Sequence, residues 1–446
     1  MARTLHGTRD GLAESALLVG AITKQSRQIE THDSLDELAQ LAETAGAAVV
    51  GRVTQVLPKP NPATYIGSGK VAAIKTMVAE HRIRTVIFDD DLSPNQIRNL
   101  ERTLDCKLID RSQLILDIFA RRARTAVAKT QVELAQLDYL RTRLTRHWTH
   151  LSRQQGGIGT RGPGETQIET DRRLIGRRMA TLRHKLNKID RQRATQRRGR
   201  EQHVRVSLVG YTNAGKSTLM NALAGSDILA EDRLFATLDA TTRQIALSPK
   251  TRVLLTDTVG FIRKLPHKLI ESFKSTLDEV RQSDVLLHVV SVANVRFEDH
   301  RQVVRQTLRE IGALEIPELL VFNKIDALGA QHDTLSALLY QHPDAVFVSA
   351  LRGMGLGSLR KCLEAVVQQD HEVSVACVPV TDGKALACIR HFADVLDEHL
   401  VKARESGQPA RDAIRVRFRA GRAQPSELRA ALAPYARLHP VVECSE

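Results

Sequence analysis

The residues with the clearest chemical pattern are Gly210 to Ser217, which read GYTNAGKS. They fit the phosphate-loop pattern G-x-x-x-x-G-K-[ST], in which glycines let backbone N–H groups turn toward phosphates. In that pattern Lys216 reaches the β- and γ-phosphates, and the Ser217 hydroxyl is placed to bind Mg²⁺. The sequence therefore predicts a nucleoside-triphosphate site formed by Gly210, Tyr211, Thr212, Asn213, Ala214, Gly215, Lys216 and Ser217.

A second motif indicates which base is bound. Asp326 closes the tetrapeptide Asn323, Lys324, Ile325, Asp326. Its carboxylate can accept two hydrogen bonds from N1–H and the exocyclic amine of guanine, which adenine cannot offer. Ser349, Ala350 and Leu351 follow another apolar stretch and are expected to line the guanine with backbone groups. The predicted ligand is GTP or GDP.

The segment Asp257, Thr258, Val259, Gly260 lies between these two motifs. Its carboxylate suits a water-mediated hold on Mg²⁺, and the Gly260 N–H can meet the γ-phosphate. Many GTPases orient the attacking water with a glutamine directly after this motif, but here that residue is Phe261. An apolar side chain cannot orient water, so we expect slow intrinsic turnover and stimulation by a partner.

Asn213 has two readings. It is similar to an asparagine with which some GTPases bind a monovalent cation near the phosphates, which suggests K⁺ as a further cofactor. Alternatively, Asn213 only stabilises the turn of the loop.

These motifs follow apolar stretches at 204–209, 253–255, 319–322 and 345–348, and the first is followed by a helix near Lys216. The order predicts a GTPase domain at 201–370, with a mostly parallel sheet and helices on both faces. The chain of 446 residues is long enough for further domains. We assign residues 1–110 to an α/β domain, 111–200 to a helical hairpin and 371–446 to a small αβ domain.

The N-terminal segment alternates predicted strands (16–22, 47–56, 85–88, 106–109) and helices (34–45, 70–81, 93–104). Ser34 and Glu37 have the spacing of a capping box for the first helix. Tyr65 to Lys70 partly resembles another phosphate loop, but Val71 follows the lysine. In the C-terminal segment we expect a helix near 383–405, a strand near 413–419 and a helix near 425–433.

The net charge of +14 is concentrated in one segment, since residues 121–200 hold 21 Lys and Arg against 6 Asp and Glu. Their apolar spacing predicts two long helices, 110–150 and 166–198, joined by a tip with five glycines in 156–165. Such an excess is typical of nucleic-acid binding, and Arg161, Arg172 and Arg173 are candidates for phosphate contacts. The alternatives are a solvated helical face and a flexible linker.

The five cysteines have no C-x-x-C spacing, so neither a disulfide framework nor a zinc site is indicated. No stretch approaches the roughly 20 apolar residues of a membrane helix, and residues 1–10 lack the apolar core of a secretion signal. We expect a cytoplasmic monomer without stable membrane insertion; peripheral membrane association is the alternative.

Several segments closely resemble the HflX family of GTPases, within the Obg-HflX-like superfamily. The most specific is GGIGTRGPGETQIETDRR from Gly156, and the others are QVELAQLDYL from Gln131, FDDDLSPNQIRNLE from Phe88, GYTNAGKSTLMN from Gly210 and FATLDATTR from Phe235. The resemblance covers about residues 14–370. Ala240 departs from it, since family members often carry proline there.

The resemblance implies a factor that binds the large ribosomal subunit and its RNA through its basic N-terminal region and splits or rescues stalled ribosomes under stress. It also implies nucleotide contacts by Phe235, Ala236, Thr237, Leu238 and Asp239. The resemblance, and not the spacing, favours Thr237 over Thr241 or Thr242 as the mobile Mg²⁺ ligand beside Ser217. The groups assigned to catalysis are Lys216, Thr237, Gly260 and Asn213. Two other classes stay open: an RNA-remodelling enzyme with an N-terminal ATP site, and a membrane or metal-homeostasis regulator.

Overall fold

The structure is a computed structural model. It describes residues 14–23, 28–143, 163–197, 204–225, 234–235, 237–248, 251–264, 274–328, 332–369, 371–404, 411–421, 426–435 and 439–440. The chain forms two compact units: residues 1–191, 230–239 and 259–278 make the first, and residues 192–229, 240–258 and 279–446 make the second. The segments 230–239 and 259–278, which include the predicted nucleotide contacts 235–239 and Gly260, thus belong to the unit that contains the N-terminal residues.

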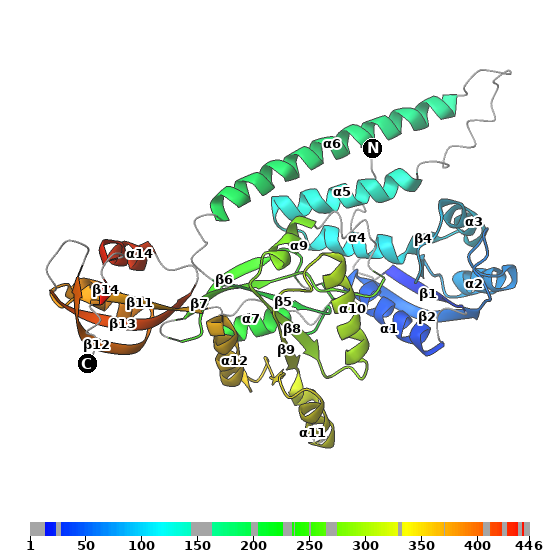
Figure 1. Cartoon of the computed structure of the whole chain (residues 1–446). Helices are drawn as coiled ribbons and strands as arrows, with labels where there is room; N and C mark the ends of the chain where they lie inside the picture. Colours follow the sequence, from blue (N-terminus) through cyan, green and yellow to red (C-terminus); the bar gives the residue numbers. More distant parts are fainter. Residues whose placement is uncertain are drawn as a thin grey trace. The chain divides into compact units, whose positions relative to one another are not determined.

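A four-stranded parallel sheet organises the N-terminal residues, with strand order β2-β1-β3-β4 (Figure 1). Strands β1 and β3 are almost entirely buried, as expected for a parallel sheet covered on both faces. The predicted alternation of strand and helix is confirmed. The elements are β1 (Glu14–Ile22), α1 (Gln28–Thr44), β2 (Ala47–Val56), α2 (Ser68–Glu80), β3 (Thr85–Phe88), α3 (Pro94–Leu104) and β4 (Lys107–Asp110).

The capping box predicted at Ser34 is wrong. Helix α1 already runs from Gln28, and the Ser34 hydroxyl donates to Asp89 Oδ2 at 2.7 Å from within the helix. A capping box does exist at Ser93 and Gln96, where each side chain accepts a hydrogen bond from the backbone N–H of the other residue. The role of Ser34 is therefore a tertiary hydrogen bond to Asp89 and not the capping of a helix.

The basic segment contains three helices: α4 (Arg111–Arg122), α5 (Ala126–Arg143) and α6 (Pro163–Arg197). The single helix predicted over 110–150 is wrong, because the chain breaks between α4 and α5. Met179, Leu182 and Leu186 of α6 pack with Leu134 in one apolar cluster. Leu174 of the same helix is 54% exposed. Residues 156–162 of the glycine-rich tip, which include Arg161, lie outside the described residues, and α6 begins at Pro163.

A six-stranded sheet follows, in the order β10-β9-β8-β5-β7-β6, parallel except for β6 (Figure 1). Its strands are β5 (Val204–Gly210), β6 (Thr241–Ala246), β7 (Arg252–Asp257), β8 (Val285–Ser291), β9 (Glu318–Asn323) and β10 (Val346–Phe347). Its helices are α7 (Lys216–Ala224), α9 (Lys274–Arg281), α10 (Phe297–Glu310), η2 (Ile325–Leu328), α11 (His332–Gln341) and α12 (Leu356–Gln369).

Helices cover both faces of this sheet. Leu219 of α7 and Leu359 of α12 share one core with Val289 of β8. The next residue along β8, Val290, packs instead with Phe297 of α10 and Leu338 of α11. The predicted architecture of a mostly parallel sheet between helices is confirmed.

The C-terminal residues form an antiparallel sheet in the order β11-β13-β12-β14. Its elements are β11 (His371–Pro379), α13 (Gly383–Phe392), β12 (Asp394–Arg404), β13 (Arg411–Gly421), α14 (Ser426–Leu432), η3 (Ala433–Tyr435) and β14 (His439–Pro440). The helix predicted to 405 is wrong beyond Phe392, where β12 begins. Strand β11 was not predicted. The strand and helix predicted near 413–419 and 425–433 are confirmed.

No helix among the described residues is long and apolar enough to cross a membrane.

Candidate nucleotide-binding site

The carboxyl ends of the parallel strands carry the predicted motifs. The phosphate loop follows β5, Asp257 ends β7, Asn323 ends β9 and Ser349 comes shortly after β10. Because the carboxyl ends of parallel strands meet at one edge of a sheet, this is where open α/β proteins bind ligands.

The phosphate loop requires its two glycines. Gly215 has φ +89, and a Cβ at this position would overlap the side-chain nitrogen of Asn323. A Cβ on Gly210 would overlap the carbonyl oxygen of Val289 in the neighbouring strand. Asn213, with φ 59, also adopts the left-handed region that asparagine tolerates. The backbone thus turns tightly just before α7, whose N-terminus can offer N–H groups to an anion.

Lys216 is buried at the first position of α7. Its Nζ donates to the carbonyl oxygens of Gly210 at 3.1 Å and Tyr211 at 3.0 Å. Burial lowers the pKa of Lys216 to about 8, although the charge of Asp257 works in the opposite direction. The ammonium group is therefore held inside the loop but is easily neutralised.

This lowered pKa predicts a pH dependence of nucleotide affinity. Only the protonated amine attracts phosphate, and the protonated fraction at a pKa of about 8 falls about sevenfold between pH 7 and pH 8.8. We expect GDP affinity to fall by about this factor over that range, as measured by calorimetric titration. An unchanged affinity would show that Lys216 remains charged in the empty site.

The oxygens of Ser217 and Asp257 lie together. The Ser217 hydroxyl donates to Asp257 Oδ2 at 2.5 Å. The strand β7 and the helix α7 thus bring a hydroxyl and a carboxylate to one point, and both are hard oxygen donors of the kind Mg²⁺ prefers. This donor pair fits a magnesium ion.

Asn323 connects three of the predicted motifs. Its side-chain Nδ2 donates to the carbonyl oxygen of Ala214 at 2.9 Å, and its Oδ1 accepts from the N–H of Ala350 at 3.0 Å. Asn323 is 1% exposed. A single buried amide therefore fixes the phosphate loop and the loop at Ser349 relative to the end of β9. Leu351, in contrast, is 80% exposed.

Asp326 has an unoccupied acceptor. Its Oδ1 is buried and has no hydrogen-bond partner among the described residues, while Oδ2 lies 3.9 Å from Arg352 Nε. A buried carboxylate oxygen without a donor is unfavourable, so such atoms usually bind a ligand or water. The two donors on the edge of guanine would satisfy it.

Other predicted site residues lie in the first unit, where they contact the N-terminal residues. Asp239 Oδ2 accepts from the N–H groups of Arg124 and Thr125, both at 3.1 Å, and Asp239 also bonds the Thr125 hydroxyl. The ring of Phe235 packs edge-on against Phe119, with centroids 4.7 Å apart. Ala236 lies outside the described residues. These contacts were not predicted from the sequence, because the partners are more than 100 residues apart along the chain.

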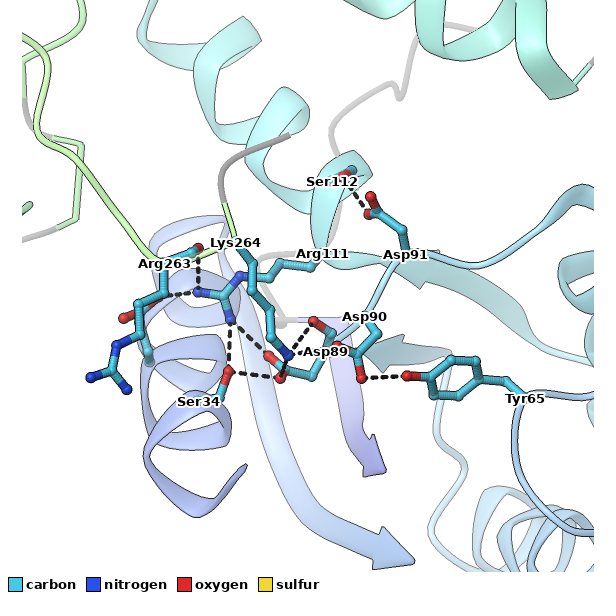
Figure 2. A network of polar contacts seen from close by, with 10 residues as sticks. Ser34, Tyr65, Asp89, Asp90, Asp91, Arg111, Ser112, Arg263 and Lys264 are labelled. Atoms are coloured by element: carbon cyan, nitrogen blue, oxygen red, sulfur yellow. Dashed lines mark hydrogen bonds and ion pairs between the residues drawn. The ribbon is translucent and has the colours of Figure 1, made fainter. Parts of the chain in front are cut away.

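The residues after Gly260 lie against the carboxyl end of β3. Phe261 and Ile262 are buried, and Lys264 Nζ donates to Asp89 Oδ2 and Asp90 Oδ1, both at 2.6 Å (Figure 2). Burial by itself would lower the pKa of Lys264, but the two carboxylates outweigh it and raise that pKa. The only sequence signal was the acidic run 89–91.

Arg111 is the centre of this network. Its guanidinium is 2% exposed and binds Asp89 Oδ1 at 2.7 Å, Glu37, and the carbonyl oxygen of Arg263 at 3.2 Å (Figure 2). One cation thus connects α1, β3 and the segment after Gly260.

Replacing Arg111 with methionine is expected to destabilise the protein by about 3–5 kcal/mol, because Asp89 would remain buried with less compensation. Urea unfolding would measure this loss in the free energy of unfolding. Arg52→Met is the matched control, since the Arg52–Asp36 pair is about half exposed and should contribute less than about 1 kcal/mol. Equal losses in both variants would contradict a central role for Arg111.

The fold and the site together define a class. A parallel sheet with a phosphate loop after β5, a buried Lys216, a Ser217–Asp257 pair and an open carboxylate at Asp326 is the architecture of a P-loop GTPase.

Comparison with known proteins identifies the family. Three family models match: "GTP-binding GTPase N-terminal" at residues 32–120, "GTP-binding GTPase Middle Region" at 122–200 and "50S ribosome-binding GTPase" at 205–324. GTPase HflX of Flavobacterium psychrophilum is 53% identical over 73% of this chain and 78% of its own length. GTPase HflX of Escherichia coli is 46% identical over 83% of this chain and 87% of its own.

A solved structure is also similar. It is a GTP-binding protein from the archaeon Sulfolobus solfataricus in complex with GDP, 26% identical, with a TM-score of 0.43 over 80% of this chain and 99% of that chain. The sequence relatives are decisive: this chain belongs to the HflX family of GTPases, and it is an enzyme that binds guanine nucleotides and hydrolyses GTP.

Proposed function

We propose that this GTPase binds the large ribosomal subunit and its RNA through its basic helices and splits or rescues stalled ribosomes under stress. The description of the matched GTPase region names the 50S ribosome, which supports this partner. The proposed nucleotide contacts are those at 210–217, 235–239, 257–260, 323–326 and 349–351. The proposed domains are 1–110, 111–200, 201–370 and 371–446.

The basic helices supply a surface suited to RNA. In α6, the side chains of Arg172, Arg173, Arg177, Arg183, Lys185 and Lys188 are all exposed, while Met179, Leu182 and Leu186 are buried. The positive charge therefore faces solvent along the helix. Neutralising RNA phosphates with such a surface releases counterions, which drives binding.

The observation that carries the proposal is the contact between Asp239 and the start of the basic helix α5. Asp239 lies two residues after Thr237, the proposed mobile Mg²⁺ ligand. Reordering of this loop when GTP binds would break or remake the hydrogen bonds to Arg124 and Thr125. The loop after Gly260 is connected to the N-terminal sheet in the same way, through Lys264. Nucleotide state would thereby control how the basic helices engage the subunit, and hydrolysis would release it.

The chemistry at the phosphates is assigned to the following groups. Mg²⁺ would be held by Ser217 and Thr237, with Asp257 behind Ser217, and would neutralise charge on the phosphate oxygens. Lys216 supplies a second positive charge, and the Gly260 N–H meets the γ-phosphate. Because Phe261 is buried and apolar, the water is positioned by other groups, and we propose that the subunit completes the site.

The role of Asn213 in binding potassium can be tested. Its Oδ1 accepts from Lys324 Nζ at 3.3 Å, so the amide already has a cationic partner. If Asn213 holds K⁺ as a catalytic cation, hydrolysis is expected to be at least tenfold faster in potassium than in sodium at equal ionic strength. Equal rates would leave Asn213 as a residue that stabilises the loop.

The function is tested by GTP hydrolysis with and without large ribosomal subunits, with an unrelated transcript at equal RNA phosphate as the control. Stimulation by the subunit alone supports the proposal. No stimulation, or equal stimulation by any RNA, would favour a general RNA-binding GTPase. Sucrose-gradient analysis of intact ribosomes mixed with protein and GTP would then test splitting directly.

The N-terminal ATP site gains no support. The N–H of Gly67, which a phosphate loop would direct at the ligand, donates to Gln55 Oε1 at 2.9 Å. Nucleotide binding would have to break this bond.

A further inference from the structure

One face of the C-terminal sheet carries a row of arginines. Helices α13 and α14 pack against the other face, in a core that includes Val416, Phe418 and Leu428. Side chains alternate between the two faces along a strand. Arg415, Arg417 and Arg419 of β13 therefore lie together on the opposite face, away from the core that α13 and α14 share. At the Arg415 end of this face, Tyr435 of η3 packs with Cys377 and Ala413. The matched family regions end at residue 324 and assign nothing here.

These arginines outnumber the acidic residues that lie opposite them in the sheet. None of the three forms a hydrogen bond or ion pair with any residue that the structure describes. Val373 and Val375 lie opposite Arg419 and Arg417 on β11 and are about half exposed. On β12 the neighbour of Arg417 is Asp397, whose Oδ2 is bonded to His399 Nε2 at 2.9 Å. Asp394 lies opposite Arg419 on the same strand, so two aspartates of β12 are paired in register with the three arginines.

A purely structural explanation is weak. Alternate residues of a strand are about 7 Å apart, so the three charges repel one another in the folded chain. Packing does not require arginine on a solvent-exposed face, where a mixture of charges is ordinary. A regularly spaced row of planar guanidinium groups is instead suited to the evenly spaced phosphates of a nucleic-acid strand.

We propose that this face, named here the arginine face and defined by Arg415, Arg417 and Arg419, binds the phosphodiester backbone of RNA. Contacts to phosphate position a protein without reading sequence. The arginine face therefore binds RNA independently of sequence, and it needs neither GTP nor the basic helices, which takes it beyond the proposed function.

The test uses the full chain and a fluorescent single-stranded RNA of about 20 nucleotides. The triple variant Arg415→Gln, Arg417→Gln, Arg419→Gln is expected to bind at least tenfold more weakly at 0.1 M salt. Its slope of log affinity against log salt should be smaller by about 2, because three phosphate contacts are removed from a single strand. Two RNAs of unrelated sequence should give the same loss.

A matched control removes three charges from the other side of the same sheet. Lys384 and Arg390 of α13 and Lys402 of β12 are exposed and lie away from the arginine face. Lys384→Gln, Arg390→Gln, Lys402→Gln should leave affinity within about twofold. Thermal unfolding of all three proteins verifies folding. Crosslinking with 4-thiouridine RNA should label residues within 371–421 in the native chain and not in the first triple variant.

Three outcomes would overturn the proposal: equal losses in both triple variants, unchanged binding in the first one, or the absence of crosslinks to 371–421. Vesicles with 30% phosphatidylserine separate a lipid surface from an RNA surface. If the first triple variant lost vesicle binding and kept RNA binding, the arginine face would be a membrane contact. The probe in this test is naked RNA and not a ribosomal subunit. If large subunits failed to stimulate GTP hydrolysis, the proposed function would fail, but the binding of RNA by the arginine face would still be decided by the triple variants.

Discussion

Replacing Lys216 with methionine is expected to weaken GTP and GDP binding by at least about a hundredfold while leaving the fold intact. The lost contacts are charge-assisted hydrogen bonds to phosphate oxygens, each contributing about 1.5–3 kcal/mol. Methionine fills the space of the lysine stem, and it removes an ammonium group whose burial is unfavourable, as its lowered pKa indicates. The free energy of unfolding should therefore change by less than about 1 kcal/mol.

Titration with a fluorescent GDP derivative would measure the affinity, and urea unfolding would measure the stability. Lys361→Met on α12 is the matched control, because that lysine is exposed on the same domain and should bind GDP like the native protein. Retained affinity in Lys216→Met would mean that Gly210 to Ser217 is not the phosphate site. Loss of folding would mean that the bonds to Gly210 and Tyr211 have a structural role.

The nucleotide motifs were predictable from the sequence because their chemistry is local. The glycines of the phosphate loop, the lysine and the serine lie within eight residues, and the loop needs φ values that only certain residues adopt. The apolar strands before each motif were equally clear. What the sequence did not reveal is the connection made by Asn323, whose partners Ala214 and Ala350 are 109 and 27 residues away.

The break between α4 and α5 illustrates a limit of periodicity. The apolar positions continue across Ala123 to Thr125, so the pattern predicts one helix. In the structure the N–H groups of Arg124 and Thr125 bond to Asp239, and Thr125 caps the N–H of Ala128 at 3.1 Å. Thr125 is thus the N-cap of α5, and the distant carboxylate of Asp239 holds the turn that precedes it. Local sequence could not show the contact with Asp239.

The C-terminal error has a different cause. Residues 394–404 read DVLDEHLVKAR, whose apolar positions fit a helix as well as a strand. These residues form a strand because they pair with β13 in antiparallel register. Strand β13 in turn contributes the apolar Val416 and Phe418 to the core. Charged strands such as β12 depend on such tertiary partners more than helices do.

Replacing Asp326 with asparagine is expected to lower GTP affinity by about a hundredfold or more. The carboxylate can accept from both guanine donors, whereas an amide presents an N–H to one of them. A site whose buried polar groups no longer match its ligand discriminates strongly. Xanthine carries a carbonyl oxygen where guanine has its amine, so the amide N–H of the variant can donate to it. The variant should therefore prefer xanthosine diphosphate over GDP, reversing the native order.

Competition against a fluorescent guanine nucleotide would give both affinities. Asp344→Asn is the matched control, because Asp344 is an exposed aspartate in the loop before β10. This substitution should change neither the affinity for GDP nor that for xanthosine diphosphate. If Asp326→Asn bound GDP like the native protein, guanine would be recognised elsewhere. If it lost both nucleotides equally, Asp326 would hold the loop and not the base. The reversal matters most, because a damaged site loses affinity but does not acquire a new preference. It would also show that the Asp326 carboxylate, whose Oδ1 has no partner among the described residues, selects guanine.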